Sequence, residues 1–139
     1  MKLSLGIDIG TSGIRTAVID MSGEPISMMR VKHRKQNPDF IEASYWWTSV
    51  CDCIQMQVDQ LKKINISPQS ISHIAVDGTS GSMVLTDSNL TPVTRALMYN
   101  SKGFVTEAGI IGENAPLKHI TRGSSSALGR AMRLISEDR

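Results

Sequence analysis

The chain has 139 residues, of which 40% are hydrophobic, 20% charged and 4% aromatic, and its formal charge is +2. These values are typical of one globular domain. They exclude a membrane-spanning helix, for which no apolar run is long enough, and a nucleic-acid-binding surface, for which the positive charge is too small and too evenly spread. Cys51 and Cys53 lie in an expected helix and point to different sides, so a disulfide framework is excluded and a reducing, cytoplasmic location is expected.

The first part of the chain contains three β-prone runs joined by tight, glycine-containing turns. The runs are residues 3–9, 14–21 and 26–32. Because the connections are this short, we expect an antiparallel meander. The basic residues in and after the third run predict a solvated edge strand, since positive charge discourages pairing with another chain. They are Arg30, Lys32, His33, Arg34 and Lys35.

The pattern of apolar residues then changes to a helical period in residues 45–63. The expected buried face consists of Trp47, Val50, Cys51, Ile54, Val58 and Leu61. We expect an amphipathic helix of about five turns. Ser44 or Asp39 would cap its N-terminus, and the segment 65–68 would end it.

The second half begins with another apolar strand, residues 71–77. Its last residue is Asp77, and Asp8 is the last but one residue of the first strand. Short strands are expected at 83–86 and 93–99, and helices at 104–112 and 124–137, the last with Leu128, Met132 and Ile135 on one face. Strand 71–77 should pair in parallel with strand 3–9, with helix 45–63 as the crossover. The predicted fold class is therefore α/β with a mixed sheet, and nothing in the sequence marks a linker.

The segment 8–13, Asp-Ile-Gly-Thr-Ser-Gly, has the composition of a phosphate-binding turn. Its glycines permit a close backbone approach, and its free N–H groups and hydroxyls can hold phosphate oxygens. Asp8 can hold Mg²⁺, mostly through water. The candidate phosphate-binding residues are Gly10, Thr11, Ser12, Gly13 and Arg15. The alternative is an ordinary hairpin turn with a capping Asp, and a Walker A loop is excluded because no Gly-Lys-Ser or Gly-Lys-Thr follows.

A second polar, glycine-rich turn, residues 77–82, follows the strand 71–77. Ligands favour the carboxyl ends of parallel strands, so this turn and the first are expected at the same edge of the sheet, on two sides of a cleft. The alternative for the second turn is a local Asx turn.

Three motifs together resemble the amino-terminal part of the FGGY carbohydrate kinases. They are LGIDIGTSGIRTAVID, IAVDGTSGSMVLTD and TRALMYN. This family belongs to the actin/hexokinase/heat-shock-70 ATPase superfamily, which has a ribonuclease-H-like core. The second and third motifs look most like those of the pentulose-kinase branch, the D-ribulokinases and xylulokinases.

The resemblance implies ATP-dependent phosphorylation of a pentulose hydroxyl, with D-ribulose or D-xylulose as the sugar and ATP and Mg²⁺ as cofactors. Asp8 would organise the metal, and the turn after it would face the ATP phosphates. The implied residues on the substrate side are Asp77, Gly78, Thr79, Ser80, Gly81 and Asn100. Asn100 is followed by Ser101, where many relatives have Asp.

The resemblance also implies that residues 1–139 are the amino-terminal part of the first kinase domain. The adenosine-binding domain would be absent, and the catalytic base would be an Asp beyond Arg139, so no catalytic residue is expected in this chain and the chain alone is expected to be inactive. The alternative is a non-catalytic, nucleotide-gated binding or assembly module. The expected partners are a small sugar and ATP, without nucleic acid or membrane. Self-association through helix 124–137 and an open sheet edge would give a homodimer.

Overall fold

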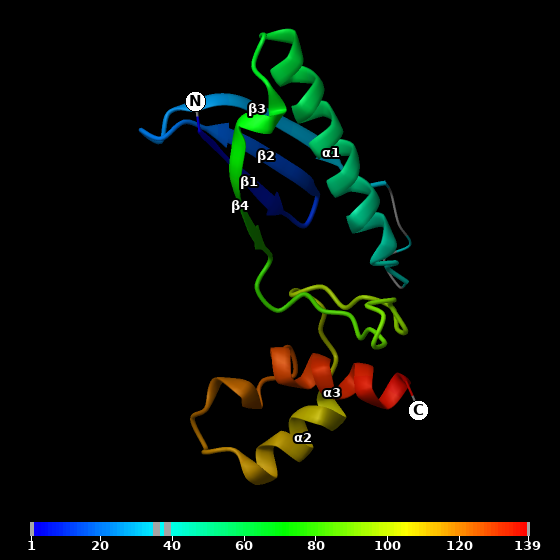
Figure 1. Cartoon of the computed structure of the whole chain (residues 1–139). Coiled ribbons are helices and arrows are strands. Elements are labelled where there is room, and N and C mark those ends of the chain that lie inside the picture. The colour runs from blue at the N-terminus through cyan, green and yellow to red at the C-terminus, as the bar shows by residue number, and fades with distance from the viewer. Residues whose placement is uncertain (1, 35–36, 38–39, 139) are drawn as a thin grey trace. The chain divides into compact units, whose positions relative to one another are not determined.

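The computed structural model describes residues 2–34, 37 and 40–138 (Figure 1). The chain divides into two compact units, each of which is described by itself. Unit 1 comprises Met1–Lys35 and Ser44–Thr79, and unit 2 comprises Gln36–Ala43 and Ser80–Arg139. Among the described helices, none combines the length and the apolar character that crossing a lipid bilayer requires.

Unit 1 contains a four-stranded mixed sheet. Its strands are β1 (Leu3–Ile9), β2 (Gly13–Ile19), β3 (Pro25–Lys32) and β4 (Ile71–Gly78), the last preceded by the short 3-10 helix η1 (Pro68–Ser70). The strand order is β3-β2-β1-β4. β1 to β3 form the predicted antiparallel meander, and β4 pairs in parallel with β1. Both predicted pairings are confirmed. Arg30, Lys32 and Arg34 lie at the β3 edge, whereas Lys35 lies outside the described residues.

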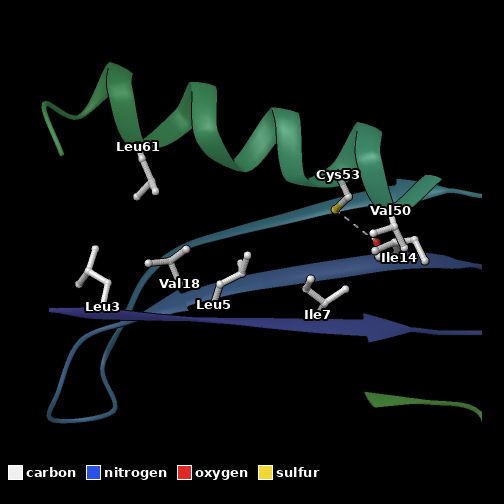
Figure 2. Packing of buried hydrophobic residues seen from close by; sticks show 8 residues of the cluster. All are labelled: Leu3, Leu5, Ile7, Ile14, Val18, Val50, Cys53 and Leu61. Atoms are coloured by element: carbon white, nitrogen blue, oxygen red, sulfur yellow. Dashed lines mark hydrogen bonds between the residues drawn. The ribbon is translucent and has the colours of Figure 1, made fainter. Parts of the chain in front are cut away.

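Helix α1 (Ser44–Lys63) is the crossover between β3 and β4, and it packs on β2 and β3. Alternate residues of β1 and β2 point toward it, because successive side chains of a strand face opposite sides of a sheet. Figure 2 shows the resulting core, which lies between the helix and the sheet. It consists of Leu3, Leu5, Ile7, Ile14, Val18, Val50, Cys53 and Leu61.

The predicted buried face of the α1 helix was partly wrong. Trp47 is 69% exposed and Cys51 is exposed, whereas the polar Gln57 is only 1% exposed. The Gln57 amide oxygen accepts a hydrogen bond from Thr16 (3.1 Å), and its nitrogen donates one to Ser27 (2.7 Å). The hydroxyls of these two strand residues face the helix and need partners when buried. α1 therefore turns Gln57, rather than Trp47, toward the sheet. Asp39, one of the two predicted caps, lies outside the described residues.

The strands expected at 83–86 and 93–99 are absent from the described residues of unit 2. Isolated bridges join Met83 to Leu97 and Thr86 to Pro92 instead. The Leu85 N–H donates to the side chain of Thr94 rather than to a backbone carbonyl, at 3.1 Å. Proline has no N–H to offer to a partner strand. The pairing is thus interrupted on both sides of the turn.

The two predicted helices of unit 2 are confirmed as α2 (Val105–Asn114) and α3 (Ala127–Glu137), with the short η2 (Ile120–Arg122) between them. Ser126 caps α3, because its hydroxyl accepts a hydrogen bond from the Gly129 N–H at 3.0 Å. Two of the three residues on its expected apolar face are exposed. Leu128 and Ile135 are 44% and 49% exposed, and Leu134 is the fully buried residue. It forms a small cluster with Leu97 and Phe104.

Candidate functional site

Three charged side chains lie together at one end of the unit 1 sheet. Asp8 of β1 is opposite Asp77 of the parallel strand β4 and opposite Arg15 of the antiparallel strand β2. All three lie on the face of the sheet away from α1, since Ile7, one residue before Asp8, is buried beneath the helix. Arg15 Nη1 donates a hydrogen bond to Asp8 Oδ2 at 3.0 Å. Asp8 and Arg15 remain about half exposed, so a ligand in solvent can reach them.

The charges of this region and the small residues that line it suit a ligand that carries phosphate together with a divalent cation. Two carboxylates and one guanidinium leave one net negative charge, and carboxylate oxygens are the ligands that Mg²⁺ prefers. Among the described residues, no group of three or more His, Cys, Asp or Glu side chains forms a metal cage. Mg²⁺ usually keeps several waters, so a site with one or two carboxylates fits it. Beside them a shallow hollow is lined by the small residues Gly6, Ala17 and Ala75.

The turn after β1, residues 10–13, is an exposed loop whose two ends are joined by a hydrogen bond. The Gly10 N–H donates to the Gly13 carbonyl oxygen at 3.0 Å. Thr11 and Ser12 are exposed at the tip, and their hydroxyls make no hydrogen bond within the described part of the chain. A Cβ atom on Gly13 would lie 2.1 Å from the Val31 carbonyl oxygen, so only glycine fits against β3 here.

His33 stabilises this turn through hydrogen bonds. From the sequence it was expected only as part of a solvated edge strand. Its backbone N–H donates to the Ser12 carbonyl oxygen at 3.1 Å. Its ring Nε2 lies 2.9 Å from the Gly10 carbonyl oxygen, and because a carbonyl only accepts, Nε2 is the donor. Ring Nδ1 lies 3.1 Å from the hydroxyl of Ser49 on α1. The half-buried imidazole thus connects the turn to the helix.

The second polar turn crosses the division between the units. Asp77, Gly78 and Thr79 belong to unit 1, and Ser80 and Gly81 belong to unit 2. The Gly78 N–H donates to Asp77 Oδ1 at 2.8 Å, which ties this carboxylate to the residue that follows it. The structure therefore places Asp77 beside the first turn and describes Ser80 and Gly81 with the rest of unit 2.

Arg130 of α3 holds the unit 2 part of this turn, and the sequence did not predict it. The residue is only 4% exposed, and burial lowers the pKa of its guanidinium. Nε donates to the Gly81 carbonyl oxygen (2.9 Å) and Nη1 donates to that of Ser125 (2.7 Å). Gly81 has φ +81°, and a Cβ there would lie 2.8 Å from Arg130 Nη2. Glycine is thus required for both the backbone conformation and the contact.

The third motif lies beside the second within unit 2. The Tyr99 N–H donates to the Ser82 hydroxyl oxygen at 3.0 Å. Asn100 is exposed in a turn that the Ser101 N–H closes by donating to the Met98 carbonyl oxygen at 2.9 Å. The candidate residues therefore form two groups. One surrounds Asp8 in unit 1, and the other surrounds Arg130 in unit 2.

Comparison with known proteins gives a family match over most of the chain. Residues 3–125 match the N-terminal domain of the FGGY family of carbohydrate kinases. The D-ribulokinase of Saccharomyces cerevisiae is 28% identical over 96 residues, which cover 66% of this chain and 13% of that protein. The chain thus spans well under two thirds of this curated relative.

Solved structures show the same fold. A xyloylose kinase from Brucella ovis superposes with a TM-score of 0.77 at 17% identity, over 98% of this chain and 30% of that chain. The glycerol kinase of Plasmodium falciparum, solved with ADP, gives a TM-score of 0.73 at 11% identity, over 98% of this chain and 29% of that chain. They confirm the predicted fold class, a mixed ribonuclease-H-like sheet with flanking helices as in the actin-like ATPases.

Proposed function

Because the chain belongs to the FGGY family of carbohydrate kinases, we propose that it supplies the phosphate-binding and metal-organising part of an enzyme that transfers the γ-phosphoryl group of ATP to a sugar hydroxyl. The proposed sugar is a pentulose, D-ribulose or D-xylulose. The D-ribulokinase of Saccharomyces cerevisiae and the kinase from Brucella ovis support this choice by their names. The ADP in the glycerol kinase structure supports a nucleotide as the phosphoryl donor.

The observation that carries the proposal is the convergence of Asp8, Arg15 and Asp77 beside the exposed turn 10–13. Phosphoryl transfer depends mainly on positioning and on neutralising negative charge. Asp8 would hold Mg²⁺ through water, and the bound metal would supply that neutralisation. The backbone N–H groups of the turn, together with the hydroxyls of Thr11 and Ser12, would face the phosphates.

The remaining proposed roles follow the resemblance. Arg15 would add positive charge next to the phosphates once a metal competes for Asp8. The residues proposed for the sugar side are Asp77, Gly78, Thr79, Ser80, Gly81 and Asn100. No residue of this chain is proposed as the general base. We place that base in polypeptide beyond Arg139, and we therefore expect the 139-residue chain alone to phosphorylate no sugar.

Binding of Mg²⁺ and nucleotide to the 139-residue chain tests the metal and phosphate roles directly. NMR titration with ATP and Mg²⁺ should shift the amide signals of Gly10, Thr11 and Ser12. Asp8→Asn should remove the Mg²⁺ dependence of that shift, because the amide keeps the shape of the carboxylate and loses its charge. Asp52→Asn, an exposed carboxylate on α1, is the matched control and should behave as wild type.

A polypeptide that extends beyond residue 139 tests the reaction, in a coupled assay with ATP, Mg²⁺ and a panel of ketoses. There Asp8→Asn should lower turnover roughly a hundredfold or more. Lowered stability with the turnover of the folded fraction intact would instead make Asp8 structural. Nucleotide binding without phosphorylation of any ketose would favour the non-catalytic binding or assembly module.

A further inference from the structure

Two backbone carbonyls of the turn 10–13 are hydrogen-bonded to one residue, His33. The ring Nε2 of His33 donates to the Gly10 carbonyl oxygen at 2.9 Å, and its backbone N–H donates to the Ser12 carbonyl oxygen at 3.1 Å. A peptide unit is planar and trans, so its C=O and N–H bonds point in opposite directions. The N–H groups of Thr11 and Gly13, which follow these carbonyls, therefore point away from the contacts with His33.

The N–H of Thr11 is free to bind a ligand. Thr11 is exposed, and its N–H has no hydrogen-bond partner in the part of the chain that the structure describes. The Gly10 N–H is already used within the turn, because it donates to the Gly13 carbonyl oxygen. A free N–H directed outward from a turn attracts an anion. The orientation of the Gly10–Thr11 peptide unit thus decides whether the turn presents this donor.

Ser49 on α1 holds the imidazole of His33 in the orientation that the Gly10 contact needs. A carbonyl only accepts, so the proton of a neutral ring has to be on Nε2, and Nδ1 is left as an acceptor. The Ser49 hydroxyl lies 3.1 Å from Nδ1 and can donate to it. It also lies 2.9 Å from the Tyr45 carbonyl oxygen, to which it donates when the ring is protonated and Nδ1 itself is a donor. Ser49 is 4% exposed and lies next to Val50 of the core, so the ring is fixed from a side where solvent has little access.

We propose that His33 and Ser49 are positioning residues for the phosphate-binding turn. His33 directs the Thr11 N–H toward a phosphate group of the nucleotide, and Ser49 fixes the ring that does so. Neither side chain is assigned a contact with the nucleotide itself. The inference rests on the proposed function, because that function supplies the phosphate as the ligand of the turn.

The first test measures whether Ser49 fixes the ring. NMR of the imidazole nitrogens in the 139-residue chain, in alkaline solution where imidazole is neutral, distinguishes Nδ1 from Nε2. We expect the proton on Nε2 in the wild type, and we expect Ser49→Ala to shift the Nδ1 signal because Nδ1 loses its donor. Thr48→Ala is the matched control, since the Thr48 hydroxyl also donates to a helix carbonyl, that of Ser44 at 3.2 Å, and has no histidine partner among the described residues. A proton on Nδ1, or an Nδ1 signal that Ser49→Ala leaves unchanged, would overturn the proposal.

The second test measures nucleotide binding. Titration of the 139-residue chain with ATP and Mg²⁺, followed by NMR, should shift the Thr11 amide signal in the wild type. His33→Phe keeps an aromatic ring and removes the donor, so the Gly10–Thr11 peptide unit loses its fixed orientation. The dissociation constant should rise about fivefold, as for one lost hydrogen bond, and that of Ser49→Ala should rise about threefold. His119→Phe, at an exposed histidine of unit 2, is the control and should behave as wild type.

A conservative replacement separates the hydrogen bond from packing. The amide nitrogen of a glutamine lies the same number of bonds from Cα as Nε2 of a histidine. His33→Gln should therefore donate to the Gly10 carbonyl and restore most of the affinity that His33→Phe loses. Recovery by Gln but not by Phe is not expected of a residue that only fills space. A deficit in His33→Phe that is equally large in His33→Gln would overturn the proposal.

The binding measurements also distinguish this inference from the function on which it rests. A wild-type chain that binds no nucleotide would overturn the proposed function, and the inference with it. A wild-type chain that binds, with His33→Phe and Ser49→Ala binding equally well, would overturn the inference alone. If His33→Phe does not fold, as a loss of amide signal dispersion would show, the comparison of Ser49→Ala with Thr48→Ala decides, and equal dissociation constants for these two variants would overturn the inference.

Discussion

The two units of this chain are stabilised by different means. Unit 1 buries eight apolar residues in one cluster between a regular sheet and α1. The described part of unit 2 buries five, of which Leu97, Phe104 and Leu134 form its own cluster, and much of its chain is irregular. Because unit 2 buries less apolar surface, its loops need other contacts to hold them in one conformation. The first glycine-rich turn thus follows strands of a well-packed sheet, whereas the unit 2 part of the second turn is held mainly by polar contacts.

In unit 2, arginine side chains supply these contacts as hydrogen bonds to backbone carbonyls. Arg122 donates to the carbonyl oxygens of Gly112 and Ala115, at 2.7 and 2.6 Å. Arg130 does the same for the carbonyls of the second polar turn and of the segment before α3. The guanidinium suits this task because it offers five donors in a rigid plane. Loops with unpaired carbonyls are thereby satisfied without a strand partner.

The largest effect is expected in the unit 1 core. Leu61 is fully buried, and Leu61→Ala removes its contacts and leaves a cavity beneath α1, so the free energy of unfolding should fall by about 3 kcal/mol. Denaturant unfolding, with hydrogen exchange read on β1 and β2, measures the loss. Leu117→Ala is the control, because Leu117 is 87% exposed, and its effect should stay within about 0.5 kcal/mol. Equal losses at the two positions would remove the basis for the comparison of the units.

The next effect is expected at Arg130 in unit 2. Arg130→Met keeps much of the length of the side chain and removes the donors to the Gly81 and Ser125 carbonyls, so local stability should fall by about 2 kcal/mol. Arg130→Lys should recover less than half, since one ammonium cannot reproduce the planar fork. Hydrogen exchange and limited proteolysis around residues 80–83 and 124–126 report the change. The exposed Arg30→Met is the control, and a loss as large there would show that the contacts of Arg130 are not the cause.

The sequence was sufficient for most of unit 1 because its elements depend on periodicity. The strands and the crossover helix were predicted within two residues of their bounds, as were the parallel and antiparallel pairings. The orientation of α1 was predicted less well, because the prediction counted only apolar residues and Gln57 is buried by hydrogen bonds to Thr16 and Ser27. In unit 2 the expected strands did not form, and the Leu85 N–H has a side-chain oxygen rather than a backbone carbonyl as its hydrogen-bond partner.

The candidate site divides in the same way. Asp8 and the turn 10–13 could be proposed from residue type and order, because phosphate and metal binding demand particular side chains at short spacing. His33 and Arg130 were not found, because their partners are backbone carbonyls distant in the chain. A carbonyl is present at every residue and leaves no signal in the sequence. Only the fold reveals which carbonyl a side chain reaches.

A smaller effect is expected at His33, where the comparison can be sharpened. His33→Ala removes the ring donor to the Gly10 carbonyl and the contact with Ser49, so the turn 10–13 should open more often. Exchange of the Gly10 amide, which donates to Gly13, should rise about fivefold, the equivalent of about 1 kcal/mol. His119→Ala, an exposed histidine of unit 2, is the control. An unchanged exchange rate would show that packing alone holds the first turn.

An effect of similar size concerns pH and the ion pair between α2 and α3. Arg133 donates to both oxygens of Glu107, at 2.5 and 2.9 Å, and its guanidinium lies 5.5 Å from the centre of the Phe104 ring. These hydrogen bonds hold the pKa of Glu107 below its ordinary value of 4.5. A carboxyl whose pKa is lower in the folded state stabilises the fold above that ordinary value, and the contribution is lost as the pH falls through the folded pKa.

We therefore expect Glu107→Gln to lower the free energy of unfolding by about 1 kcal/mol at pH 7 and to have a diminishing effect as the pH falls below 4.5. Urea unfolding at pH 7, 5 and 3 measures the difference between the variant and the wild type. Glu113→Gln, an exposed carboxylate of the same helix, should show little difference at any of these pH values. A Glu107→Gln loss that is the same at pH 7 and pH 3 would mean that the packing of the side chain, and not its charge, joins α2 to α3. Unit 2 would then resemble unit 1 more closely than its arginines suggest.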